Sequence, residues 1–376
     1  MPGAEPQTAG SGGSKDFKDR ISPAAINRLA DVLLEAWEPF PAERFAGPAT
    51  RGLTGLELKA RVVHVADALA ATLPAEFPEA AKVLESALES EAFDGWIVYP
   101  VDDFVARYGI DYPEISLPLM GRLTSRWSCE FAIRPFIERH PDITFEYFGR
   151  WIGSDDEHRR RLVSEGSRPR LPWGGHLRRF REDPAPAIAL LDRLVDDPSP
   201  YVRKSVANHL NDIARDHPAL AIETGRRWLE GGGNPGRRRW IVARGMRSLV
   251  KQGVPAALVL LGYDPEAPVT ISEFVVEPAS IRIGESITIG FSLMAPEPTP
   301  AIVDYVVHHA GANGIRSPKV FKLKTVELEP GEQHHFQKRH SIREVSVRRI
   351  YPGPHQVEVQ VNGRVLASAI VEVTAG

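Results

Sequence analysis

The sequence predicts a multidomain protein, an all-α helical solenoid of the HEAT-like kind followed by an all-β immunoglobulin-like sandwich. Two observations predict this order. Segments 183–218 and 217–250 share one shape, a helix that leads through a Pro- or Gly-rich turn into a second helix with early arginines. Such a degenerate repeat, with a period of roughly 40 residues, is typical of HEAT-like solenoids. From about Pro265 onward the apolar residues alternate with polar ones, and about seven short strands in this stretch indicate a sandwich.

The expected domain boundaries follow from changes in composition and period. Residues 1–20 are rich in Gly, Ser and Pro and lack the apolar core of a signal peptide, so we expect a disordered lead-in. The helical domain is expected over residues 21–262. The sandwich is expected over residues 263–376.

The helices are expected from 3.6-residue periodicity and from their start signals. Ser22 followed by Pro23 starts the first helix, because serine caps a helix and proline suits its first position. Residues 53–74 and 78–90 repeat the apolar pattern of amphipathic helices. The aromatic stretch 96–112 has no clear period and receives no assignment.

The strands are expected between turn signals. Pro330-Gly331 and Pro352-Gly353 separate alternating segments, and Asn362-Gly363 predicts a tight hairpin. The sandwich contains no cysteine pair, so it is expected to be stable without a disulfide.

Composition excludes several classes of protein. The chain has 376 residues, 43% hydrophobic and 25% charged, which is ordinary for a globular protein. Cys129 is the only cysteine, which favours a reducing compartment, and we expect a cytoplasmic protein. No apolar run approaches the roughly 20 residues of a membrane span. Zinc spacings, a Walker loop and a dinucleotide fingerprint are all missing, so neither a metal nor a cofactor is expected.

The small net charge of −3 conceals a basic middle third. Residues 121–263 carry 25 Lys+Arg and 17 Asp+Glu, which gives this segment a net charge of +8, and most of its basic residues are arginines. Arginine binds phosphate as a bidentate fork, so a polyanion is one candidate partner. Solvated helix faces balanced by nearby acids explain the charge equally well.

Three acidic residues are candidates for a site, each on its own predicted helix: Glu130, Glu165 and Asp212. Arg126 and Arg134 stand four residues either side of Glu130, a spacing that also fits salt bridges on an exposed helix. Arg161 and Arg168 share a helix face with Glu165.

A proline-stiffened turn, residues 168–174, follows the helix of Glu165 and ends in Trp173 and a glycine. Its rigidity would hold Trp173 as the wall of a site. The alternative is a core tryptophan that fills a repeat junction.

The helix predicted from Ser199 places an apolar stripe on one side and polar residues on the other. Lys204, Asn208, Asn211, Asp212 and Arg215 form that polar side. Asparagine is a poor helix former, so two of them suggest a bound ligand. Several arginines in the next segment are expected to meet phosphates. They are Arg237, Arg238, Arg239, Arg244 and Arg247.

Three motifs, CEFAIRPF, RRLVSEGSRPRLPWG and SVANHLNDIARDHP, together resemble the AlkC-type DNA alkylation repair glycosylases, relatives of AlkD. The resemblance extends over residues 16–255, and the sandwich resembles an extra domain of some members. It implies a HEAT-like solenoid that binds duplex DNA and removes cationic N3-alkylated bases, such as 3-methyladenine and 3-methylcytosine, without full base flipping. A monomer is expected.

The resemblance also implies roles for single residues. It places the catalytic acids at Glu130, Glu165 and Asp212, with Arg161 and Trp173 lining the site. Further residues are expected to contact the lesion, and one more to contact the DNA backbone. The lesion-contacting residues are Phe131, Trp127, Arg168 and Asn208, and the backbone residue is Lys204.

Two alternatives stay open. A HEAT-like scaffold without chemistry would bind nucleic acid or protein through the same repeats. An RNA-directed glycosylase would use the same acids on a different substrate.

The sandwich is acidic overall, because residues 264–376 have a net charge of −2. Basic side chains nevertheless gather near one strand–turn–strand region. Exposed charges act over only about 8–10 Å at physiological salt, so this local cluster outweighs the net charge. We expect Lys338, Arg339 and Arg343 to contact the DNA backbone. A solubilising rim on an inert accessory domain is the alternative.

Overall fold

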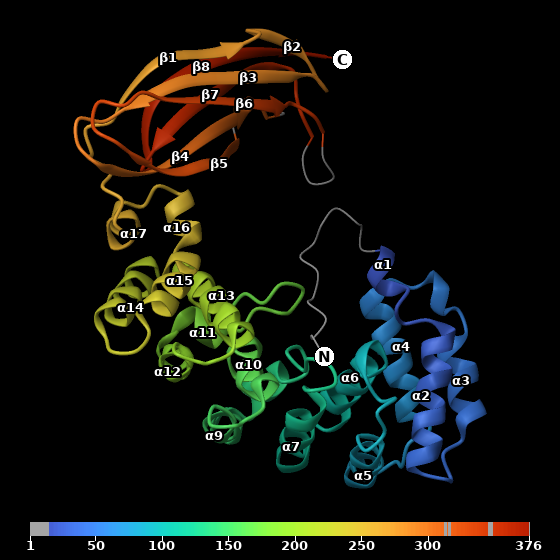
Figure 1. The fold of residues 1–376 in the computed structure, drawn as a ribbon. Coiled ribbons are helices and arrows are strands. Elements are labelled where there is room, and N and C mark those ends of the chain that lie inside the picture. The colour runs from blue at the N-terminus through green and yellow to red at the C-terminus, as the bar shows by residue number, and fades with distance from the viewer. Residues whose placement is uncertain (1–14, 312–313, 315–316, 345–348, 376) are drawn as a thin grey trace. The chain divides into compact units, whose positions relative to one another are not determined.

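The computed structural model describes residues 15–311, 314, 317–344 and 349–375. They divide into two compact units, the first ending at Ile213 and the second beginning at Ala214. The first unit is helical, whereas the second begins with helices and continues as strands (Figure 1). The predicted order of a helical region followed by a β-sandwich is therefore confirmed. The predicted boundary at residue 262 and the HEAT-like character of the helices stay predictions.

Short helices joined by tight turns make up the first unit. They are α1 (Lys15–Lys18), α2 (Pro23–Ala36), α3 (Ala42–Thr50), α4 (Leu58–Ala70), α5 (Phe77–Ala87), α6 (Tyr99–Tyr108), α7 (Pro113–Leu123), α8 (Arg134–Arg139), α9 (Pro141–Trp151), α10 (Glu157–Gly166), α11 (Arg178–Glu182), α12 (Ala185–Leu194) and α13 (Pro200–Asp216), with 3₁₀ turns at Leu53–Gly55 and Gly95–Ile97.

Local sequence sets where these helices begin. The Ser22 hydroxyl accepts a hydrogen bond from the Ala25 N–H at 3.2 Å and caps α2, as predicted. At α13 the Ser199 hydroxyl accepts from the Tyr201 N–H, with Pro200 in the first position. Proline suits this position because its missing N–H would have no partner inside the helix.

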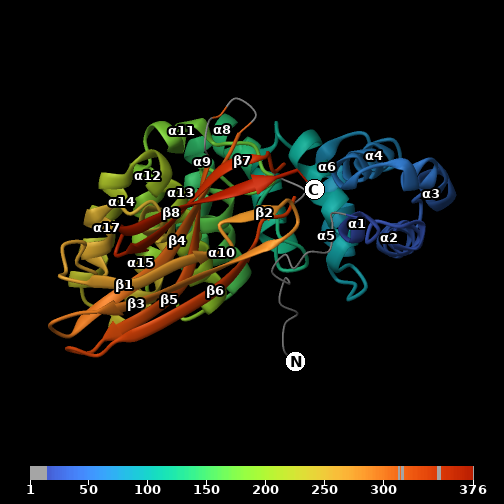
Figure 2. The same cartoon turned by 90° about the horizontal axis from the view of Figure 1, so that it is seen from above.

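The helices of the first unit pack against their neighbours in chain order. Helices α2, α3 and α4 contact one another in sequence and lie side by side (Figure 2). Further along, α7 contacts α9, and α10 contacts both α9 and α12. Their apolar stripes meet in the interior, where Val202, Val206 and Leu210 of α13 are fully buried.

The folded chain begins earlier than predicted. Residues 1–14 of the expected lead-in lie outside the described part of the chain, but Lys15–Lys18 form α1. The Phe17 ring stacks on Trp96 at 5.9 Å, and Lys18 forms an ion pair with Glu57. These contacts, which are distant in sequence, hold α1 against the unit.

The second unit contains helices α14 (Pro218–Glu230), α15 (Pro235–Gly245), α16 (Arg247–Lys251) and α17 (Pro255–Leu260). Its strands are β1 (Thr270–Glu277), β2 (Ser280–Arg282), β3 (Ser286–Met294), β4 (Thr299–His309), β5 (Ser317–Leu328), β6 (His334–Ser341), β7 (Gly353–Val361) and β8 (Arg364–Thr374).

The strands form two sheets that stack as layers (Figure 1), with strand orders β1-β3-β6 and β2-β8-β7-β4-β5. Alternate residues of β3 and β7, among them Ile287, Ile289 and Val357, are buried in the space between the sheets. The β7–β8 hairpin turns at Asn362 and Gly363, both with positive φ, as the Asn-Gly signal predicted.

No helix in the described part of the chain combines the length and apolar character needed to cross a membrane.

Candidate functional site

Glu165, in the last turn of α10, lies at the centre of a buried cluster of carboxylates and guanidinium groups. Its Oε1 lies 2.7 Å from Arg168 Nη1 and 3.6 Å from Arg161 Nη2. Its Oε2 accepts a hydrogen bond from the Ser205 hydroxyl at 2.6 Å. Arg161 and Glu165 share a face of α10, whereas Arg168 lies beyond the end of the helix at Gly166 and still reaches Glu165.

Glu165 is ionised over the whole physiological pH range. Burial alone would raise the pKa of this carboxyl, but Arg161, Arg168 and the Ser205 hydroxyl outweigh burial and lower the pKa to about 2. A negative charge held permanently in a buried position is suited to stabilising positive charge nearby.

Asp212 joins this cluster from α13. Arg168 Nε donates to Asp212 Oδ2 at 2.8 Å, so one guanidinium group bridges Glu165 and Asp212. Asp212 is only 3% exposed and Asn211 is fully buried. The polar side predicted for this helix is therefore buried at these two residues, because α13 is covered on that side as well. Lys204 and Arg215 of the same polar side are exposed, and Asn208 is half-buried.

Glu130 completes the set of acids and is the most accessible of the three. Its Oε2 lies 2.7 Å from Arg161 Nη1 and accepts from the Ser128 hydroxyl at 2.9 Å. Its side chain is 17% exposed, against 9% for Glu165 and 4% for Asp212. Arg161 thus links Glu130 to Glu165, as Arg168 links Glu165 to Asp212.

The predicted helix around Glu130 is wrong. Glu130 lies in a turn between α7 and α8, and the first two residues of α8 are Arg134 and Pro135. The expected pairs with Arg126 and Arg134 do not form, since Arg126 donates to the Leu88 carbonyl and Arg134 to the Gly166 and Arg168 carbonyls.

Close packing brings this turn to the end of α10. A Cβ on Gly166 would lie 2.4 Å from Ile133 Cγ2, so only glycine permits the approach. Arg134 then holds the loop after α10 through its bonds to main-chain carbonyls. Burial and the nearby Arg168 lower the pKa of Arg134 to about 10, at which it stays charged at neutral pH.

Trp173 is 63% exposed, so the alternative of a core tryptophan is wrong. Its φ of 64° is unusual for a residue with a large side chain and indicates a backbone held by its surroundings. Lys59 donates to the Trp173 carbonyl, and the Phe17 ring meets the indole edge-to-face at 6.1 Å.

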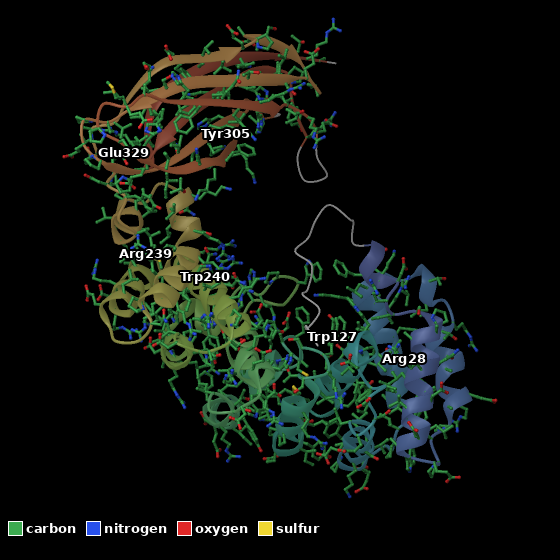
Figure 3. All side chains as sticks on the ribbon, viewed as in Figure 1. Arg28, Trp127, Arg239, Trp240, Tyr305 and Glu329 are labelled. Carbon is green, nitrogen blue, oxygen red and sulfur yellow. The ribbon has the colours of Figure 1, made fainter. Side chains whose placement is uncertain are left out.

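Trp127 and Phe131 belong to a partly exposed aromatic group built around Tyr99. Tyr99 stacks on Trp127 at 5.8 Å and on Phe131 at 5.9 Å, and Trp96 lies 4.6 Å from Trp127. Figure 3 labels Trp127 among the side chains of the first unit. Two of its members, Trp127 and Phe131, lie close to Glu130 in the chain.

Sequence reasoning missed several residues of the cluster. Ser128 and Ser205 donate to Glu130 and Glu165, and the Tyr201 ring lies 4.8 Å below the Arg161 guanidinium. Tyr201, Ser205 and Asp212 are spaced four and seven residues apart, which places them on one face of α13. Their spacing in the sequence could therefore have identified Tyr201 and Ser205 as neighbours of Asp212.

The arginines predicted to meet phosphates lie on α15 and α16 of the second unit. Arg237 and Arg239 are exposed, and Figure 3 labels Arg239 beside Trp240 on α15. Arg238 and Arg239 donate to the carbonyls of Trp228 and Leu261, Arg244 lies over the Trp240 ring, and Arg247 donates to the Arg244 carbonyl.

In the sandwich, Lys338 and Arg339 lie on β6, an edge strand, and Arg343 follows it. All three are exposed. Because successive strand residues point to opposite faces, Arg339 lies on the outer face of its sheet and Lys338 on the other.

Within the residues that the structure describes, no group of three His, Cys, Asp or Glu side chains is placed to hold a metal ion. Cys129 is a free, buried thiol, as expected.

The chain is similar to known proteins over nearly its whole length. A family model described as the C-terminal Ig-like domain of the uncharacterised protein YhaZ matches residues 270–375. Uncharacterized protein YhaZ of Bacillus subtilis (strain 168) is 32% identical over 360 residues, which covers 95% of this chain and 99% of the relative. The alkylpurine DNA glycosylase AlkC of Pseudomonas fluorescens, bound to DNA containing an abasic site analog, superposes with a TM-score of 0.89 at 37% identity. That match covers 96% of this chain and 99% of the AlkC chain.

A helical region followed by an Ig-like sandwich is the two-part arrangement that this chain shares over 96% of its length with a DNA-bound glycosylase. The chain belongs to the AlkC-type family, as its predicted resemblance indicated.

Proposed function

We propose that this protein is a DNA glycosylase that hydrolyses the N-glycosidic bond of cationic N3-alkylated bases, 3-methyladenine and 3-methylcytosine, in duplex DNA. The observation that carries the proposal is the linked set Glu130–Arg161–Glu165–Arg168–Asp212 in a chain 37% identical to a DNA-bound glycosylase. The protein acts as a cytoplasmic monomer without metal or cofactor.

Hydrolysis of this N-glycosidic bond needs little acid catalysis by the protein. A base alkylated at N3 carries a positive charge and leaves as a neutral product, so its departure needs no proton from the protein. The sugar left behind is oxocarbenium-like, and nearby carboxylates lower the energy of that charge. Glu130 is the most accessible of the three acids and has the role of contacting the sugar or the attacking water.

The inner acids hold this arrangement in place. Glu165 and Asp212 fix the two arginines, and Arg161 in turn orients Glu130 through its bonds to Glu130 and Ser128. The cluster stays charged without solvent because each carboxylate has a guanidinium partner.

The aromatic residues contact the lesion. The exposed Trp173 face attracts a cationic base. Trp127 and Phe131 on one side and Asn208 and Arg168 on the other border the position of the damaged nucleotide. The family resemblance favours action without full flipping of the base.

Basic side chains bind the DNA backbone, in a HEAT-like helical domain over residues 21–262 and in the Ig-like domain over residues 263–376. These are Lys204, Arg237, Arg238, Arg239, Arg244, Arg247, Lys338, Arg339 and Arg343.

The test is base release from methylated duplex DNA by the purified full chain, with the released bases resolved by chromatography. We expect 3-methyladenine and 3-methylcytosine among the products, and little release by Glu130→Gln. Tight DNA binding with no release would refute the enzyme and favour a non-catalytic scaffold. Release only from methylated RNA would favour the RNA-directed alternative.

A further inference from the structure

Helix α1 brings a phenylalanine from the start of the described chain to Trp173. The Phe17 ring stacks on Trp96 at 5.9 Å and meets the Trp173 indole edge-to-face at 6.1 Å. Among the aromatic rings that the structure describes, Phe17 alone contacts the Trp173 ring. Phe17 therefore joins Trp173 to the aromatic group around Tyr99, which Trp96 also contacts.

A buried arginine holds α1 in place. Arg61 of α4 is 3% exposed, and its Nη1 donates to the carbonyls of Lys18 at 2.6 Å and Ile21 at 3.0 Å. Two further hydrogen bonds from the same guanidinium reach the turn that precedes α4. A buried guanidinium is costly unless hydrogen bonds satisfy it, and two of the bonds made here fix the chain at the end of α1. The position of Phe17 therefore does not depend on its contact with Trp173.

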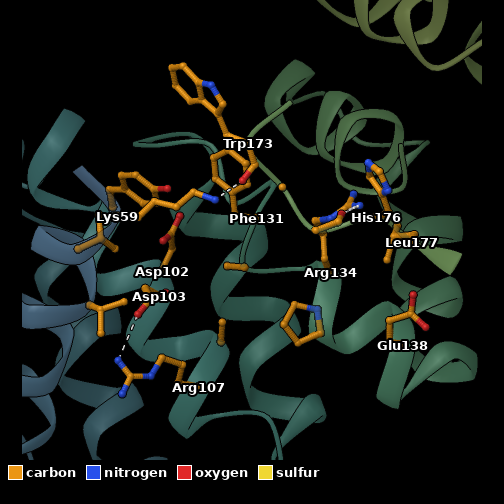
Figure 4. Close-up of a pocket in the computed structure, with 18 residues that line it drawn as sticks. Lys59, Asp102, Asp103, Arg107, Phe131, Arg134, Glu138, Trp173, His176 and Leu177 are labelled. Atoms are coloured by element: carbon orange, nitrogen blue, oxygen red, sulfur yellow. Dashed lines mark hydrogen bonds and ion pairs between the residues drawn. The ribbon is translucent and has the colours of Figure 1, made fainter. Parts of the chain in front are cut away.

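The main chain around Trp173 is held by hydrogen bonds, whereas the ring is not. Lys59 donates to the Trp173 carbonyl, and Arg134 donates to the Gly175 carbonyl. Figure 4 shows the first bond as a dashed line and the indole extending away from Lys59. Trp173 is 63% exposed, and a side chain this exposed changes rotamer rapidly unless a neighbour restrains it. Phe17 is the neighbour in a position to do so.

The contact with Phe17 leaves the indole able to bind a cation. In an edge-to-face pair at least one face of the indole stays uncovered, and the face is the part of the ring that attracts positive charge. Phe17 thus restrains the ring without occupying the surface that a charged base would use.

We propose that Phe17 is a positioning residue, which holds the Trp173 indole in the orientation that meets the cationic base. The inference rests on the proposed glycosylase function, in which Trp173 contacts the lesion. Phe17 acts through Trp173 and makes no contact with the reacting atoms.

The charge of the base determines which step depends on Phe17. An alkylated base is positively charged while it is attached to the sugar and neutral once it has left. The indole therefore stabilises the bound substrate more than the separated base. Loss of Phe17 should weaken capture of the lesion and leave the bond-breaking step nearly unchanged.

The test is single-turnover release of 3-methylcytosine from a duplex that carries one such base, measured over a range of protein concentrations. We expect Phe17→Ala to raise the protein concentration at half-maximal rate about fivefold, the size of a cation–π contact at a partly exposed site. Its maximal rate should stay within about twofold of wild type, because bond breaking does not use this contact. Phe17→Tyr keeps the ring and should match wild type in both quantities.

The matched control is Phe145→Ala. Phe145 of α9 is also half-buried and also contacts two aromatic rings, those of Phe148 and Phe180, neither of which belongs to the proposed site. This variant should capture the lesion and release it like wild type. An equal rise in the half-maximal concentration in Phe145→Ala and Phe17→Ala would attribute the effect to lost packing and overturn the proposal.

A double-mutant cycle separates positioning from a general loss of stability. If Phe17 acts through Trp173, the protein with both Phe17→Ala and Trp173→Ala should have the same half-maximal concentration as Trp173→Ala alone. Effects that multiply in the double variant would show that Phe17 acts independently of Trp173, and would overturn the proposal. Thermal unfolding of each variant sets an assay temperature at which all of them are folded.

Two outcomes distinguish this inference from the function on which it rests. Release by wild type with an unchanged half-maximal concentration in Phe17→Ala would refute the positioning role and leave the glycosylase function standing. Wild-type protein that releases neither 3-methylcytosine nor 3-methyladenine would refute the glycosylase function and the positioning role with it.

Discussion

Replacing Glu165 by glutamine removes the central charge of the cluster and keeps the shape of the side chain. Two arginines, Arg161 and Arg168, then lose a common partner in a buried position. The pKa of Glu165 is lowered from 4.5 to about 2 in the folded chain. Since each pKa unit corresponds to about 1.4 kcal/mol, the fold favours the ionised form by about 3 kcal/mol.

We therefore expect Glu165→Gln to lower the free energy of unfolding by about 3 kcal/mol at pH 7, measured by chemical denaturation. Because the pKa is lower in the folded chain than in the unfolded chain, this contribution is fully present above about pH 4.5 and is lost as the pH falls through about 2. The difference between wild type and variant should shrink over that window and stay constant from pH 6 to 8.

The matched control is Glu146→Gln. Glu146 also pairs with an arginine four residues away, Arg150, but both side chains are 60% exposed. An exposed pair of this kind contributes about 0.3–0.5 kcal/mol. An equal loss in both variants would refute the assignment of Glu165 to a buried, charged cluster.

The same variant tests catalysis. If the cluster stabilises the sugar cation, Glu165→Gln should release 3-methyladenine at least about tenfold more slowly, a barrier increase of about 1.4 kcal/mol, with duplex affinity nearly kept. Wild-type turnover in a folded Glu165→Gln protein would remove this residue from the active site.

Three further predictions concern the third acid and the proposed DNA-binding residues. Asp212→Asn should also lower base release at least about tenfold, and a full rate would mean that Asp212 only supports Arg168. The logarithm of the duplex-binding constant should fall with the logarithm of the salt concentration, at a slope of about −0.9 per phosphate neutralised, and Arg237→Gln should make this slope shallower by about that amount. Fluorescence anisotropy from about 50 to about 200 mM salt measures both slopes. An unaltered slope in the variant argues against a phosphate contact at Arg237. Arg339→Glu should weaken duplex binding in the same assay while Glu329→Gln, on the same sandwich, leaves it unchanged; equal affinities would leave β6 without a role in binding DNA.

The helical part of the site could be predicted where its contacts are local. Arg161 and Glu165 lie four residues apart on α10, so helix geometry brings them together, and Arg168 follows the end of α10 only three residues after Glu165. The same reasoning failed at Glu130, because the spacing to Arg126 and Arg134 fits a helix that does not form there. The partner of Glu130 is Arg161, a contact between elements that no local spacing reports.

Burial was the other quantity that the sequence concealed. Asn211 and Asp212 lie on the polar side of an amphipathic helix, and the sequence does not tell whether another element covers that side; both are buried. Phe17 is half-buried as well, although it lies in the stretch expected to be a disordered lead-in, because its ring packs against Trp96 and Trp173, which are distant in sequence.

The pairing within the cluster also constrains how such a site can change over evolutionary time. Three carboxylates share two guanidinium groups, a formal excess of one negative charge in a buried space. Loss of one acid leaves an arginine as a buried charge without a full set of partners, and loss of one arginine leaves two buried carboxylates that repel each other. In related proteins that remain folded, a substitution at Arg168 should therefore be accompanied by a substitution at Glu165 or Asp212. A single substitution at one of these positions should cost stability, and a second substitution at its partner should recover part of that loss.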